Sequence, residues 1–104
     1  MAEHAAVIDV SRYYPAPGKR NELLAAMRKL AESAASSKGC FGVQVCASDQ
    51  DAEALIAISR WASESSLQAF ANAPAFVHEH ERLTSLLAKP AVREHFRRDR
   101  EVVR

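Results

Sequence analysis

Two hydrophobic periods alternate along the chain, and their order restricts its fold more than any other feature. Short runs rich in β-branched and aromatic residues lie at residues 6–14, 40–47 and 54–61, which is typical of strands. Apolar residues at helical spacing fill residues 19–35 and recur within 63–87. The predicted order is therefore strand, helix, strand, strand, helix, helix.

Turn and capping residues mark where these segments begin and end. Pro15 and Pro17 stop the first strand, and the acidic run SDQDAE joins the second and third strands as a hairpin. Ser63 is a typical N-cap for the next helix. Pro74 suits the first turn of the last helix, which we expect to extend to Leu87.

The C-terminal segment, residues 90–104, has two interpretations. Val92 and Phe96 alternate with charged residues, which predicts a last strand. The alternative is an arm in solvent, because acidic residues interrupt its arginines, a pattern that does not favour a nucleic-acid site. These arginines are Arg93, Arg97, Arg98, Arg100 and Arg104.

The complete order β-α-β-β-α-α-β predicts an α+β fold of the ferredoxin-like kind, in which helices cover one face of an antiparallel sheet. Alternation in the strands places Asp9, Ser11 and Tyr13 on one face. It places an apolar set on the other: Ile8, Val10, Ile56 and Ile58. Since the predicted helices suffice for only one face, we expect a second copy to cover the other in a homodimer.

The length and composition restrict the function. With 104 residues, 48% of them hydrophobic, the chain predicts a single folded domain, residues 1–104. A net charge of +1 gives no general attraction for nucleic acid or a membrane surface, so we expect a small apolar ligand and a protein partner. Cys40 and Cys46 lie on one strand about 20 Å apart, too far to bridge. With no visible signal peptide, this predicts a cytoplasmic protein.

Four features in order resemble the antibiotic biosynthesis monooxygenase family of dimeric α+β barrels. They are the turn at residues 17–19 (PGK), the pair Gly39-Cys40, the pair Arg60-Trp61, and the helix start at residues 63–70 (SESSLQAF). The resemblance covers about residues 6–88. It implies a homodimer with a ligand cavity between sheet and helices in each subunit. It also implies oxygenation of phenolic or quinol-like substrates without a cofactor in some members, and haem degradation in others.

The resemblance also implies roles for particular residues. Trp61 matches a tryptophan of members that oxidise aromatic polyketides, whereas Ala57, Leu67 and Cys46 replace their asparagine, tyrosine and histidine. His80 matches the iron-ligating histidine of the haem-degrading branch. In that branch Ser11 and Phe70 replace an asparagine and a tryptophan.

His80 and Trp61 are the candidate catalytic residues. His80 shares a helical stripe with Phe76 and Leu83 and so points inward, whereas His78 points outward. An inward histidine can be a general base or a core residue with a hydrogen-bond partner. Trp61 can position a substrate or close the core at the end of its strand.

The candidate substrate-binding residues are a polar row and an aromatic pair. Asp9, Ser11 and Tyr13 lie on the face that the helices should cover, where polar groups need partners. They either line a pocket or sit at a rim that water reaches. Phe70 and Phe76 are expected to form the apolar wall.

The leading hypothesis is a monooxygenase that inserts oxygen into a small phenolic or quinol-like substrate without metal or flavin, with His80 as base. The sequence contains no metal-ligand spacing, phosphate loop or serine-histidine-acid motif. The alternatives are a non-catalytic dimeric module that binds a small ligand and a haem-binding member. We expect haem to bind weakly or not at all.

Overall fold

A computed structural model describes residues 6–104; the first five residues, on which the expectation of no signal peptide partly rests, lie outside this range. Four strands and three helices follow one another in the described chain. Their bounds are β1 (Val7–Tyr13), α1 (Arg20–Ala35), β2 (Cys40–Ala47), β3 (Leu55–Trp61), α2 (Glu64–Ala71), α3 (Pro74–Thr84) and β4 (Val92–Arg97).

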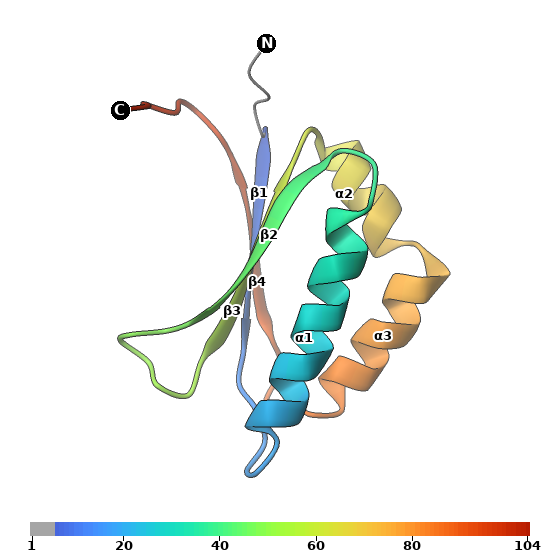
Figure 1. Ribbon diagram of the computed structural model, residues 1–104, viewed down its shortest axis with the longest axis vertical. Coiled ribbons are helices and arrows are strands. Elements are labelled where there is room, and N and C mark those ends of the chain that lie inside the picture. The colour runs from blue at the N-terminus through green and yellow to red at the C-terminus, as the bar shows by residue number, and fades with distance from the viewer. Residues whose placement is uncertain (1–5) are drawn as a thin grey trace.

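The strands form one antiparallel sheet in the order β2-β3-β1-β4. All three helices lie on the same side of it, and β1 begins at the end of the sheet where β4 ends (Figure 1). The predicted α+β ferredoxin-like fold is confirmed. The last segment does contain a strand, which pairs with β1 at the sheet edge.

The capping predictions for the second and third helices are confirmed. The Ser63 hydroxyl accepts a hydrogen bond from the Ser66 backbone N–H at 3.1 Å, and Pro74 occupies the first turn of α3. The prediction that the last helix extends to Leu87 is wrong. That residue instead forms a β-bridge with Pro15, so the chain leaves the helix to pair with the end of β1.

A close approach between β2 and α2 requires Gly39. Its φ of +85° favours glycine, and a Cβ built there would overlap the Ser66 side chain. The Gly39 carbonyl accepts a hydrogen bond from the Ala62 backbone N–H at 2.7 Å. This contact fixes the start of α2 close to the ends of β2 and β3.

The interior consists of two apolar clusters between sheet and helices. One is built from Tyr13, Leu23, Met27, Leu55 and Leu83. The other is built from Val7, Ala34, Trp61 and Leu67. Because the helices contribute to both clusters, burial of this apolar area is the main source of their stability.

The opposite face of the sheet has no helix on it (Figure 1). The strand register groups Ile8, Val10, Ile56 and Ile58 at the middle of that face, as predicted, and Phe96 of β4, 46% exposed, lies across from Ile8. We call these five residues the open-face patch. Within the described residues, no helix has the length and apolar character needed to cross a membrane.

Candidate functional site

A pocket lies where the two core clusters meet, between the sheet and the helices. The cavity has a volume of about 60 Å³, and its mouth is open to solvent. The lining is mainly apolar, with a polar floor on β1 and β3. The lining residues are Asp9, Ser11, Tyr13, Met27, Leu30, Ala31, Ala34, Val43, Ala57, Ser59, Trp61, Leu67, Phe70, Phe76, Leu83 and Arg93.

The polar row predicted on β1 forms part of the pocket floor. Asp9, Ser11 and Tyr13 are all buried, so the alternative of a rim that water satisfies is wrong. Burial raises the pKa of the Tyr13 phenol above its usual 10.0, against the opposing effect of a hydrogen bond with Ser11. Tyr13 is therefore a neutral hydroxyl at physiological pH and can donate a hydrogen bond into the pocket.

An aromatic row leads from the sheet to the last helix. The ring centroids of Trp61 and Phe70 are 5.4 Å apart, and those of Phe70 and Phe76 are 4.8 Å apart in an edge-on arrangement. His80 stacks on Phe76 at 5.1 Å. The first three of these side chains line the pocket, which places the predicted aromatic wall beside the polar floor.

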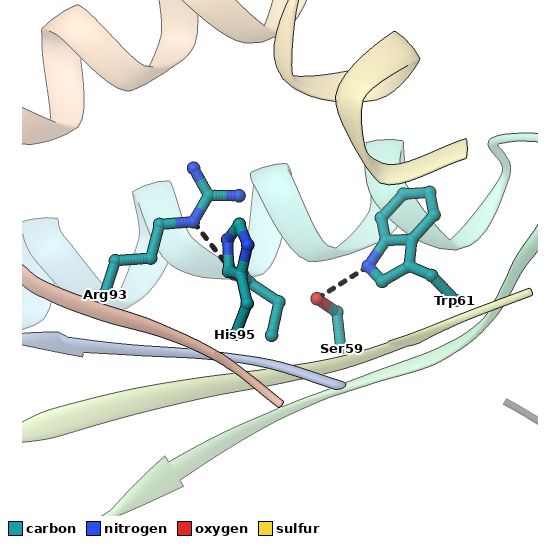
Figure 2. Close-up of polar contacts among 5 residues, drawn as sticks. Ser59, Trp61, Arg93 and His95 are labelled. Carbon is teal, nitrogen blue, oxygen red and sulfur yellow. Dashed lines mark hydrogen bonds and ion pairs between the residues drawn. The ribbon is translucent and has the colours of Figure 1, made fainter. Parts of the chain in front are cut away.

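Trp61 closes the core at the end of β3 and also borders the pocket. Only 1% of it is exposed, and it belongs to a core cluster, yet one side of it lines the pocket. Its indole Nε1–H donates a hydrogen bond to the Ser59 hydroxyl at 2.9 Å (Figure 2). This bond satisfies the buried indole and fixes the orientation of the ring.

His80 lies beside the pocket and is not among the residues that line it. It is half-buried between Phe76 and Leu83, which do line the pocket, whereas His78 is exposed. Burial lowers the pKa of His80 below its usual 6.5, and the nearby positive charge of Arg93 lowers it further. The ring is consequently neutral at physiological pH, the state that a general base requires.

A charged cluster on β1 and β4 was missed by the sequence analysis. Arg93 Nε donates to Asp9 Oδ1 at 2.9 Å, and His95 Nε2 lies 2.8 Å from the same oxygen. Arg93 lies in strand β4 and lines the pocket, so it is not part of a free arm, although 35% of its side chain is exposed to solvent. The sequence held one signal, because a carboxylate predicted to lie beneath helices needs a cation from a neighbouring strand.

The arrangement can bind a small flat molecule and offer it hydrogen bonds and one positive charge. No group of three or more His, Cys, Asp or Glu side chains within residues 6–104 is placed to hold a metal ion. Both cysteines are free and half-buried, on opposite faces of β2.

Residues 6–82 match the sequence profile of the antibiotic biosynthesis monooxygenase family. The chain belongs to this family. No curated protein sequence is similar enough to the chain to count as a close relative.

Solved structures share the fold of this family member over nearly its whole length. Rv0793 from Mycobacterium tuberculosis has a TM-score of 0.85 at 20% identity, covering 93% of this chain and 98% of that one. A conserved protein from Methanosarcina mazei has a TM-score of 0.85 at 22% identity, covering 91% and 94%. SnoaB, a cofactor-independent oxygenase from Streptomyces nogalater, has a TM-score of 0.82 at 17% identity, covering 92% and 95%.

Proposed function

We propose that this family member is a monooxygenase that oxidises a small phenolic or quinol-like substrate without metal or flavin. The observation that carries the proposal is the pocket itself, in which an aromatic row faces a floor of buried hydroxyls. A flat, electron-rich ring fits between aromatic side chains, and its oxygen finds hydrogen-bond partners on the floor. The fold of SnoaB, described as a cofactor-independent oxygenase, supports the same chemistry.

In the proposed reaction the substrate supplies the electrons. His80, which lies beside the pocket, accepts the proton of a substrate that enters un-ionised, and Ser11 and Tyr13 orient the substrate oxygen. The resulting anion reduces dioxygen in a pocket whose lining is mainly apolar. In a phenol-to-quinone conversion the substrate loses the phenolic O–H hydrogen and one ring C–H hydrogen, and the carbon that lost its hydrogen gains one oxygen atom as a carbonyl. The second oxygen atom leaves as water, which balances the four-electron reduction of dioxygen.

The second candidate is a non-catalytic module that binds a small apolar ligand. It is favoured by Ala57 and Leu67, which present only hydrocarbon to the pocket. Haem is a weaker candidate, because the pocket is small.

Oxygen consumption separates the enzyme from the module. Purified protein, shown to be free of flavin and treated with a chelator, is mixed with a panel of phenols and hydroquinones in an oxygen electrode cell. We expect uptake with at least one compound, and incorporation of one atom from isotopically labelled dioxygen into the product. Saturable binding across the panel without any oxygen uptake would contradict the enzyme and favour the module.

Neighbouring positions on α3 supply a matched control. Phe76 lines the pocket, and Val77, the next residue, is 43% exposed and does not. Phe76→Ala should lower turnover because the ring wall is lost, and Val77→Ala should leave it near the parental rate. Equal rates for both variants would place the reaction elsewhere on the protein.

A further inference from the structure

Arg93 is the one cation among the residues that line the pocket within the described chain. We propose that its guanidinium receives an ionised oxygen of the substrate, so that the pocket selects aromatic anions over neutral aromatics of the same shape. The identity of the reaction rests on the proposed function above, whereas the selection of anions is a property of binding alone.

The geometry leaves one edge of the guanidinium free for a ligand. An arginine carries five N–H donors in a planar fork, and Nε uses one of them on Asp9 Oδ1. Neither Nη atom is bonded to another residue in the part of the chain that the structure describes. Figure 2 shows the guanidinium of Arg93 standing off the sheet towards the helices, into the layer that contains the pocket.

Asp9 holds the guanidinium in this position. Its side chain is only 9% exposed, and the same carboxylate oxygen contacts both Arg93 and His95. The strand register reinforces the contact, because Arg93 pairs with Ser11 and His95 pairs with Asp9 across the ladder between β1 and β4. The free edge is therefore oriented before a ligand arrives, which reduces the entropy lost on binding.

The residues around Arg93 affect how strongly its positive charge attracts an anionic ligand. Apart from Asp9 and Arg93, every residue that lines the pocket is uncharged. The Arg93 side chain is 35% exposed, so water at the pocket mouth screens part of its charge, whereas the apolar lining on the pocket side screens it less than bulk water does. Asp9 occupies the Nε edge, so an anionic oxygen at the Nη edge approaches the cation from the other side. His80 stacks on Phe76 beside the pocket, and the positive charge of Arg93 adds to burial in lowering its pKa.

The probe pair is 4-nitrophenol, used at a pH where it is fully ionised, and 4-nitroanisole, its neutral methyl ether. Binding of each probe to the full-length protein is measured by calorimetry. Binding of the phenolate is also followed by its visible spectrum. We expect the phenolate to bind about 10- to 100-fold more tightly than the ether, the range for hydrogen bonds to a charged group. A third probe, 4-nitrobenzoate, tests whether a carboxylate is accepted in place of a phenolate oxygen.

The variants assign the preference to Arg93. Arg93→Gln should bind both probes equally, whereas Arg97→Gln, on the same strand and face but outside the pocket lining, should keep the preference. Because Arg93→Gln leaves the Asp9 carboxylate without its cation, the double variant Asp9→Asn with Arg93→Gln is measured as well. Equal binding of phenolate and ether by the parental protein, or no binding of either, would overturn the proposal. So would a folded variant lacking Arg93 that retains the preference.

This test and the oxygen test fail separately. Phenolate selectivity without oxygen uptake on any substrate leaves the anion site standing and removes the monooxygenase. Oxygen uptake in which neither binding nor KM changes in Arg93→Gln leaves the monooxygenase standing and removes the anion site.

Discussion

The face of the β1–β3 pair beneath the helices mixes apolar core residues with polar ones, whereas the opposite face, which no helix of the described chain covers, is apolar at its centre. The face beneath the helices carries buried polar residues, among them Asp9, Ser11 and Ser59, each close to partners or to the pocket. The face without helices carries the apolar open-face patch. Polar groups are costly to bury, and apolar patches are costly to expose. On the first face Asp9 and Ser59 find partners within the chain, in Arg93 and Trp61, and Ser11 lies at the pocket. For the second face we expect a second copy as its cover.

The largest expected effect is on the open face. We expect a homodimer joined through this patch, in which Ile58→Asp places two unpaired carboxylates, one from each copy, in the interface. Burying one unpaired charge costs about 3–5 kcal/mol. Because the interface would bury two of them, the dimer dissociation constant should rise by at least about a thousandfold. Light scattering at micromolar concentration should show a dimer for the parental protein and for Ile58→Val, and a monomer for Ile58→Asp. A monomeric parental protein would rule the homodimer out.

The next effect compares neighbours on β3 that face opposite ways. Leu55 is fully buried beneath the helices, whereas Ile56 lies on the open-face patch. In the monomeric Ile58→Asp background, Leu55→Ala should lower the free energy of unfolding by about 2–5 kcal/mol, because it leaves a cavity. Ile56→Ala should cost only about 1 kcal/mol, close to the difference in strand propensity. Urea unfolding measures both, and equal losses would mean that the two faces are equally packed in the monomer.

A smaller effect concerns activity on the helical side. If a substrate is oxidised, His80→Ala should lower turnover by about a hundredfold or more, the usual contribution of a positioned base. His78→Ala should change turnover little, because that side chain is exposed on α3. Circular dichroism must show that both variants are folded. A folded His80→Ala variant at the parental rate would leave the pocket working by binding and desolvation alone.

The smallest effect is the pH dependence of stability. Because burial holds the pKa of His80 below its usual 6.5, the unfolded chain takes up this proton at a higher pH than the folded one. The contribution of His80 is fully present above pH 6.5 and is lost as the pH falls through that value towards the folded pKa. His80→Gln should therefore lose less stability than the parental protein between about pH 8 and about pH 5 in urea unfolding. Identical pH profiles would mean that the ring is not desolvated.

The fold could be predicted from the sequence because its signals are local. Ser63 and Pro74 each mark a helix start without reference to any distant residue, and alternation alone assigned Asp9 and Ile8 to opposite faces. The end of the last helix could not be predicted in this way. Leu87 continues the helical spacing, but its pairing with Pro15 depends on where the two segments meet in space.

The same limit explains which part of the site was missed. Ser11, Tyr13, Trp61, Phe70 and Phe76 were predicted to face inward, and they line the pocket. Arg93 and His95 belong to a segment of alternating charges, which has no inward side until its pairing partner is known. Their roles follow from the topology, in which the last strand lies next to the first.

That topology has a consequence for the order of events during synthesis. Asp9 and Arg93 are 84 residues apart, so at about 5–20 residues per second the carboxylate is made roughly 4–17 s before its cation. All three helices on the Asp9 side of the sheet, and β3, which pairs with β1 on its other edge, are complete before β4 leaves the ribosome. The nascent pocket is apolar and acidic, and it acquires its positive charge only when the C-terminal strand adds to the edge. A chain released before that point contains the residues of both core clusters, but its pocket carries the negative charge of Asp9 without the positive charge of Arg93.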